Sequence, residues 1–121
     1  MTVLDASAVL AWLQGEAGAE VVEPLLDDGV MSAANWSEVL QKAWQHGRDA
    51  DRVAALLHAL GVSVEPVIEA DARTAALLRS GAAHLSLADR LCLALAQRLS
   101  GQAVTAERSW LAAAPDTLVI R

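Results

Sequence analysis

The stretch Val3-Leu4-Asp5-Ala6-Ser7-Ala8-Val9-Leu10 decides how this chain is expected to fold. Val3 and Leu4 are typical of the end of a short buried strand, and the Ala-rich apolar run after them is typical of a helix. Asp5 therefore stands at the carboxyl end of a strand and the amino end of a helix. Ligands of open α/β sheets bind at such junctions, so other acids that follow strands would reach the same edge.

Short apolar strands alternate with helical segments along the rest of the sequence. The expected strands cover residues 2–4, 30–33, 62–64, 103–105 and 117–120. The expected helices cover residues 6–13, 21–26, 35–46, 51–60, 69–83 and 86–99, and a short helix carries Trp110 and Leu111. Pro24 should kink or restart the second of these helices. This alternation predicts a three-layer α/β/α fold with a mostly parallel sheet of about five short strands, formed by a single domain over residues 1–121.

Composition narrows the classes of protein that fit. The net charge of −6 argues against a broad phosphate-binding face, so a nucleic acid would have to be held through a local patch or metal ions. The one cysteine, Cys92, excludes an internal disulfide and favours a reducing cytoplasm. No apolar run reaches the ~20 residues that a membrane span requires, and we therefore expect a cytoplasmic protein without membrane association.

Four acids stand in similar places at the start of expected helices: Asp5, Glu38, Asp89 and Glu107. Acids in a first helical turn often act only as caps, and the segments around Glu38 and Asp89 resemble capping boxes opened by Asn35 and by Ser86. For any one acid alone, capping is the simpler interpretation.

Helix periodicity separates two of these acids. Asp89 shares a helix face with Cys92, Leu93 and Ala96, and a carboxylate on an apolar face has to be paired or bound to metal. Glu38 lies opposite the apolar side of its helix, which favours a solvated position.

The expected sheet also brings the acids together. In a parallel sheet, acids that follow three strands converge on one edge, where their charges repel one another. Hard oxygen ligands of this kind suit Mg²⁺ or Mn²⁺. We therefore expect a divalent cation at this edge.

Four stretches, in order, resemble the motifs of PIN-domain ribonucleases, in particular the VapC-type toxins of bacterial toxin–antitoxin pairs. They are Val3–Ala8, Ala34–Val39, Leu85–Ala96 and Val104–Trp110, and Val119-Ile120-Arg121 suits the family's ending. The third stretch matches most closely, and the resemblance covers essentially the whole chain. The fourth motif usually carries aspartate where this chain has Glu107.

The resemblance implies an endoribonuclease toxin that hydrolyses RNA phosphodiester bonds with Mg²⁺ or Mn²⁺. Metal ligands would be Asp5, Asp89, Glu38 and Glu107, and the metal would lower the pKa of a bound water. Glu107 reaches one methylene further than aspartate, so it would bind metal through water or only hold the loop. Ser7 and Thr105 would orient water or phosphate, although a helix-start hydroxyl explains Ser7 equally well.

The same resemblance implies partners. A cognate antitoxin would silence the toxin, and a homodimer is expected. Trp12 and Trp44 on the early helices would contribute a hydrophobic groove to such a partner, although core packing is the simpler role for each tryptophan.

Two other functions fit parts of the pattern. The first is a catalytically weak or inactive PIN-like module whose acids cap helices or bind a basic peptide or partner protein. The second is phosphoryl transfer with Asp5 as acceptor. That chemistry would want a second acid at position 7 or a lysine after a late strand, whereas this chain has Ser7 and a single helical lysine, Lys42.

Overall fold

Five parallel strands form the centre of the molecule in the computed structural model, which describes residues 1–121. The strands are β1 (Thr2–Leu4), β2 (Gly29–Ser32), β3 (Ser63–Glu65), β4 (Gln102–Thr105) and β5 (Leu118–Val119). Their order in the sheet is β3-β2-β1-β4-β5, and every neighbouring pair is parallel. The predicted strand number and direction are confirmed.

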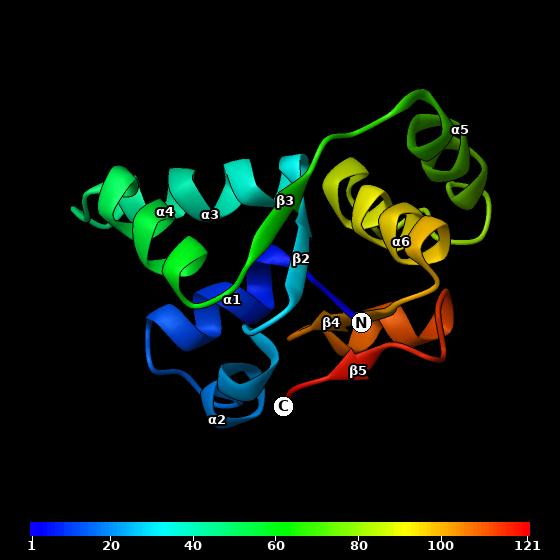
Figure 1. Cartoon of the computed structure of the whole chain (residues 1–121). Helices are drawn as coiled ribbons and strands as arrows, with labels where there is room; N and C mark the ends of the chain where they lie inside the picture. Colours follow the sequence, from blue (N-terminus) through cyan, green and yellow to red (C-terminus); the bar gives the residue numbers. More distant parts are fainter.

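Six α-helices and two 3₁₀ helices connect the strands (Figure 1). The α-helices are α1 (Ala6–Leu13), α2 (Ala19–Val22), α3 (Ala33–Gln45), α4 (Ala50–Ala59), α5 (Glu69–Leu78) and α6 (Leu87–Leu99). The 3₁₀ helices are η1 (Glu23–Leu25) and η2 (Arg108–Ala112). None of the helices is long and apolar enough to cross a membrane.

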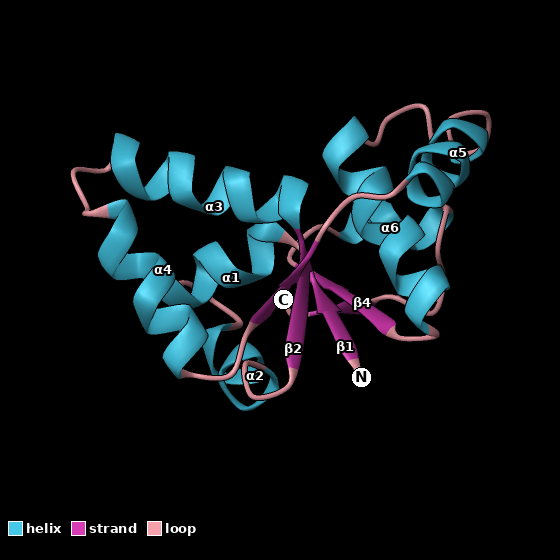
Figure 2. Ribbon diagram, turned by 45° about the horizontal axis from the view of Figure 1, so that its top comes forward, coloured by secondary structure: helices cyan, strands magenta, loops and turns pink.

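The strands alternate their side chains between two cores. Val3, Val30 and Ala103 pack with α6 and with Trp110 of η2. Leu4, Met31 and Val104 point to the other face, where α1 to α4 cover the sheet. Figure 2 shows α1, α3 and α4 on one side of the strands and α5 and α6 on the other. This arrangement is the predicted three-layer α/β/α fold.

Of the less regular helical segments, one prediction needs correction and two are confirmed. The restart predicted at Pro24 is confirmed, since the segment is divided into α2 and the 3₁₀ helix η1. The helix expected over 69–83 ends at Leu78, where the Ser80 hydroxyl donates to the Leu77 carbonyl and Gly81 follows in a turn. The short helix at Trp110 is a 3₁₀ helix.

The tryptophans differ widely in burial. Trp110 is fully buried and Trp12 is partly buried against the core, as core packing predicts. Trp44 is 74% exposed, so the expectation that it packs in the core is wrong. It lies near the carboxyl end of α3, next to Ala43, and Ala43 rather than Trp44 packs in the core.

The sheet reverses its strand order beside β1. The chain builds outward from β1 through β2 to β3, and then crosses to the other side of β1 to form β4 and β5. The carboxyl ends of β1 and β4 therefore flank the point where open α/β sheets bind ligands. Figure 1 also shows that α3 and α6 begin close to the carboxyl end of β2.

Candidate functional site

Asp5 is the most buried acid at this edge of the sheet, and only 3% of its surface is exposed. It caps α1, since its Oδ2 accepts the backbone N–H of Ser7 at 3.3 Å. The same oxygen accepts hydrogen bonds from the Ser7 hydroxyl at 2.6 Å and from the Thr105 hydroxyl at 3.0 Å. Asp5 is thus both a helix cap and the centre of a polar cluster.

Ser7 and Thr105 link two distant segments around Asp5. Their hydroxyl oxygens lie 3.0 Å apart, and each also accepts a backbone N–H: Ser7 from Ala106 at 2.9 Å and Thr105 from Glu107 at 3.2 Å. A hydroxyl has one proton, and in both residues that proton reaches Asp5. In this arrangement Ser7 and Thr105 orient the Asp5 carboxylate.

Asn35 joins the cluster from α3, although the sequence patterns did not identify it as a site residue. It is fully buried, and its Nδ2 lies 3.4 Å from Oδ1 of Asp5 and 3.3 Å from Oε1 of Glu38. The prediction that Asn35 opens a capping box is wrong, because Ser32 caps α3 by accepting the N–H of Ala34. Its position one turn before Glu38 was the available signal.

Glu38 and Asp89 are both partly buried. The prediction of a solvated Glu38 is wrong, since its carboxylate accepts from Asn35 and faces inward at the start of α3. Asp89 forms the predicted capping box: its Oδ2 accepts the N–H of Ser86 at 3.1 Å, and its own N–H donates to the Ser86 hydroxyl at 3.1 Å.

The electrostatics place these three acids in one neighbourhood. Burial raises the pKa of Asp5 from 3.8 to about 6, and the charges of Asp89 and Glu38 add to the rise, while the hydroxyls of Ser7 and Thr105 oppose it. Burial also raises the pKa of Glu38, with a further rise from Asp89 and opposing effects of Asn35 and Lys42. The carboxylates thus repel one another at the expected edge of the sheet.

Glu107 stands apart from the other acids. Its side chain is exposed, and it is not among the charges that shift the pKa of Asp5 or Glu38. Its contribution to the cluster is the backbone N–H that donates to Thr105. This contact matches the expected role of holding Thr105 and the loop.

The donor chemistry of the cluster suits a hard divalent cation. Carboxylate oxygens from Asp5, Glu38 and Asp89 are ligands that Mg²⁺ and Mn²⁺ prefer, and a cation would relieve their mutual repulsion. As the side chains are placed, however, no three His, Cys, Asp or Glu residues form a ready metal-holding group. Binding would therefore require the carboxylates to move closer together.

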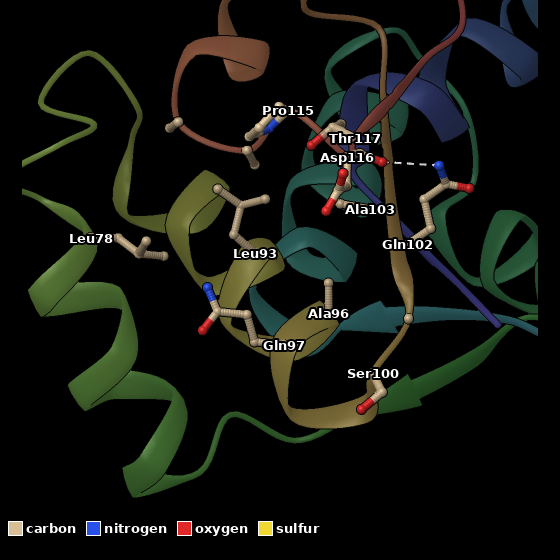
Figure 3. Close-up of a pocket in the computed structure, with 13 residues that line it drawn as sticks. Leu78, Leu93, Ala96, Gln97, Ser100, Gln102, Ala103, Pro115, Asp116 and Thr117 are labelled. Carbon is tan, nitrogen blue, oxygen red and sulfur yellow. Dashed lines mark hydrogen bonds between the residues drawn. The ribbon is translucent and has the colours of Figure 1, made fainter.

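A cavity of about 370 Å³ lies at the opposite edge of the sheet, beside the amino ends of β4 and β5. Figure 3 shows Leu93, Ala96 and Pro115 among its walls, and the hydrogen bond of 2.9 Å from Gln102 to the Asp116 carbonyl. Asp116 is the only charged residue that lines it. This cavity is separate from the acidic cluster, and its lining lacks paired carboxylates.

A family model described as the PIN domain matches residues 2–115. The chain belongs to the PIN-domain family. The match includes all the residues of the acidic cluster, and the predicted family resemblance is confirmed.

Solved structures share this PIN fold over nearly their whole length. A toxin–antitoxin complex from Klebsiella pneumoniae aligns with a TM-score of 0.85 and 20% identity, covering 100% of this chain and 98% of the other. FitAcB from Neisseria gonorrhoeae aligns with a TM-score of 0.66 and 24% identity, covering 100% and 97%.

A third structure, of FitAB bound to an IR36 DNA fragment, aligns with a TM-score of 0.67 and 25% identity, covering 98% of this chain and 93% of the other. The comparison with curated proteins gives no match. These comparisons therefore show the family and the fold of this chain.

Proposed function

We propose that this PIN-domain chain is a metal-dependent endoribonuclease and the toxin of a toxin–antitoxin pair. The observation that carries the proposal is that Asp5, Glu38 and the start of α6, which carries Asp89, come together around the Asn35 amide, beside the point where the strand order reverses. Nuclease activity is typical of the PIN-domain family, and clustered carboxylates suit the metal-assisted hydrolysis of a phosphodiester.

Asp5, Glu38 and Asp89 would hold a Mg²⁺ or Mn²⁺ ion. A bound divalent cation supplies a nucleophile at neutral pH and neutralises charge on the phosphate, which a protein of net charge −6 would otherwise repel. Ser7 and Thr105 keep the Asp5 carboxylate in one orientation through Oδ2, which leaves Oδ1 facing the amide nitrogen of Asn35. Glu107 would act through its backbone rather than as a direct ligand.

The toxin role is supported by the proteins that share the fold. One of the similar structures is a toxin–antitoxin complex, which supports a small antitoxin as partner. An acidic surface would suit a basic segment of that partner. We also propose a homodimer, which sedimentation of the purified chain would test.

A second candidate keeps the fold without the enzyme. The absence of a ready three-residue metal group and the separate position of Glu107 favour a PIN-like module that binds a basic peptide or partner protein. In that case the acids would serve as helix caps and as contacts to the partner.

An RNA cleavage assay distinguishes the nuclease from the binding module. The purified chain is incubated with a mixed RNA pool, first with Mg²⁺ or Mn²⁺ and then with chelator. We expect cation-dependent cutting that is lost in Asp5→Asn and Asp89→Asn. Asp116→Asn is the matched control, since Asp116 is an exposed acid at the opposite edge. Equal cutting in chelator would refute the metal mechanism. Uncut RNA together with a stable complex with a small basic partner would favour the binding module.

A further inference from the structure

Asn35 occupies an unusual place among the acids. One amide nitrogen lies within reach of three acceptors on three elements: Oδ1 of Asp5 at 3.4 Å, Oε1 of Glu38 at 3.3 Å and the Ala88 carbonyl of α6 at 3.2 Å. An amide NH₂ has two protons, so these contacts are shared. Ala88 directly precedes Asp89, so the start of the α6 helix is tied to the same nitrogen.

The acceptors also fix which way the amide points. A carbonyl oxygen in the place of Nδ2 would face two carboxylates and a backbone carbonyl, which electrostatics forbids. The Oδ1 of Asn35 is consequently turned elsewhere, where it is buried and has no hydrogen-bond partner. An unpaired buried carbonyl oxygen is unfavourable for folding, and a residue with only a packing role would avoid it.

We propose that Asn35 is a positioning residue: its amide nitrogen sets how Asp5 and Glu38 stand relative to each other and to the start of α6, and so sets the affinity of the acids for a divalent cation. This inference rests on the proposed metal site. It adds a residue that would not contact the metal but would hold its ligands, as outer partners of metal ligands commonly do.

Two substitutions at position 35 make opposite changes. Asn35→Ala removes the shared donor and frees Asp5, Glu38 and the start of α6 to separate. Asn35→Asp keeps the shape of the side chain but replaces the donor with a further carboxylate, which increases the repulsion that a cation relieves. If Asn35 only tethered α3 to α6, the two substitutions would change Mn²⁺ binding in the same way.

The test is Mn²⁺ binding, measured from the free Mn²⁺ signal in electron paramagnetic resonance, together with the rise in Tm that Mn²⁺ causes. We expect Asn35→Ala to bind Mn²⁺ at least roughly tenfold more weakly than the parent and to show a smaller rise in Tm. Asn35→Asp should have a lower Tm without the cation and a larger rise with it.

Val39→Ala is the matched control, because Val39 is fully buried one turn further along α3 and packs in the apolar core. It should lower the Tm and leave the Mn²⁺ affinity unchanged. The inference is overturned if Val39→Ala weakens Mn²⁺ binding as much as Asn35→Ala does, if neither Asn35 variant changes the binding, or if the parent binds no Mn²⁺. If the variants show the expected changes in Mn²⁺ binding but the parent cuts no RNA, the proposed nuclease activity is refuted. The inference about Asn35 then still holds. If Asn35→Ala does not fold, the Mn²⁺-induced rise in Tm of Asn35→Asp, compared with that of the parent, tests the inference.

Discussion

The Ser7 hydroxyl donates a hydrogen bond of 2.6 Å to Oδ2 of Asp5, and the Thr105 hydroxyl donates to the same oxygen at 3.0 Å. Two hydroxyls thus stabilise the charged form of an acid whose burial favours the neutral form. The ionised state of Asp5, which cation binding would require, depends on these two donors.

We predict that removal of either donor lowers stability when Asp5 is ionised. Ser7→Ala or Thr105→Val should reduce the free energy of unfolding by about 1.5–3 kcal/mol at pH 8, as expected for a hydrogen bond to a charged group. Urea denaturation at pH 8 and at pH 4.5 checks this, and the loss should be smaller at the lower pH. Thr105→Ser retains the hydroxyl and should be close to the parent. Equal losses at both pH values would contradict the explanation.

Asp5 should make the chain less stable as the pH rises. Its pKa in the folded chain, about 6, lies above the ordinary value of 3.8. Its contribution to stability is therefore fully present below about pH 3.8 and is lost as the pH rises through about 6.

The Asp5→Asn variant isolates this effect. It should be more stable than the parent by about 1–3 kcal/mol at pH 8, with the difference vanishing near pH 4. Thermal unfolding across this pH range measures it. Mn²⁺ should raise the Tm of the parent and not of the variant. A variant less stable than the parent at pH 8 would show that the carboxylate is better solvated than its burial indicates.

We predict that Glu107 can be replaced with little loss of function. Its side chain is exposed, and its contact with Thr105 uses backbone atoms that a substitution retains. Glu107→Gln should keep RNA cleavage and Mn²⁺ affinity close to those of the parent, whereas Asp89→Asn should lower cleavage by roughly 100-fold or more. A loss in Glu107→Gln comparable to that in Asp89→Asn would identify Glu107 as a metal ligand.

The buried and exposed tryptophans should respond differently to truncation. Trp110 fills the core between α6 and the sheet, so Trp110→Ala should reduce the free energy of unfolding by about 3–5 kcal/mol. Trp110→Phe should lose less, because the indole N–H has no hydrogen-bond partner. Trp44→Ala should stay within about 0.5 kcal/mol of the parent. Chemical denaturation of the three variants measures these differences.

The fold was predictable because strand and helix signals alternate without ambiguity. Apolar pairs such as Val3 and Leu4 pack against both faces of a covered sheet, and each of the first four strands is followed by a helical segment. The helix ends were less predictable, since they depend on local contacts such as that of the Ser80 hydroxyl with Leu77.

The acidic cluster was predictable in part. The strand–helix junction identified Asp5, and the apolar face of α6 identified Asp89. Helix periodicity misplaced Glu38, because Asp5 and Asp89 lie on other elements and turn its face of α3 into an interior one. The role of Asn35 depends on Asp5 and Ala88, which are distant in the sequence, so its position one turn before Glu38 was only a partial signal.

The hydrogen bond between Thr105 and Asp5 spans 100 residues of the chain. β1 is made long before its partner β4, which carries the Thr105 hydroxyl that steadies Asp5. A ribosome-bound nascent chain therefore lacks an assembled acidic cluster until β4 has emerged and paired with β1. For a protein that would attack RNA, this delay before β4 pairs with β1 would itself protect the ribosome that makes it.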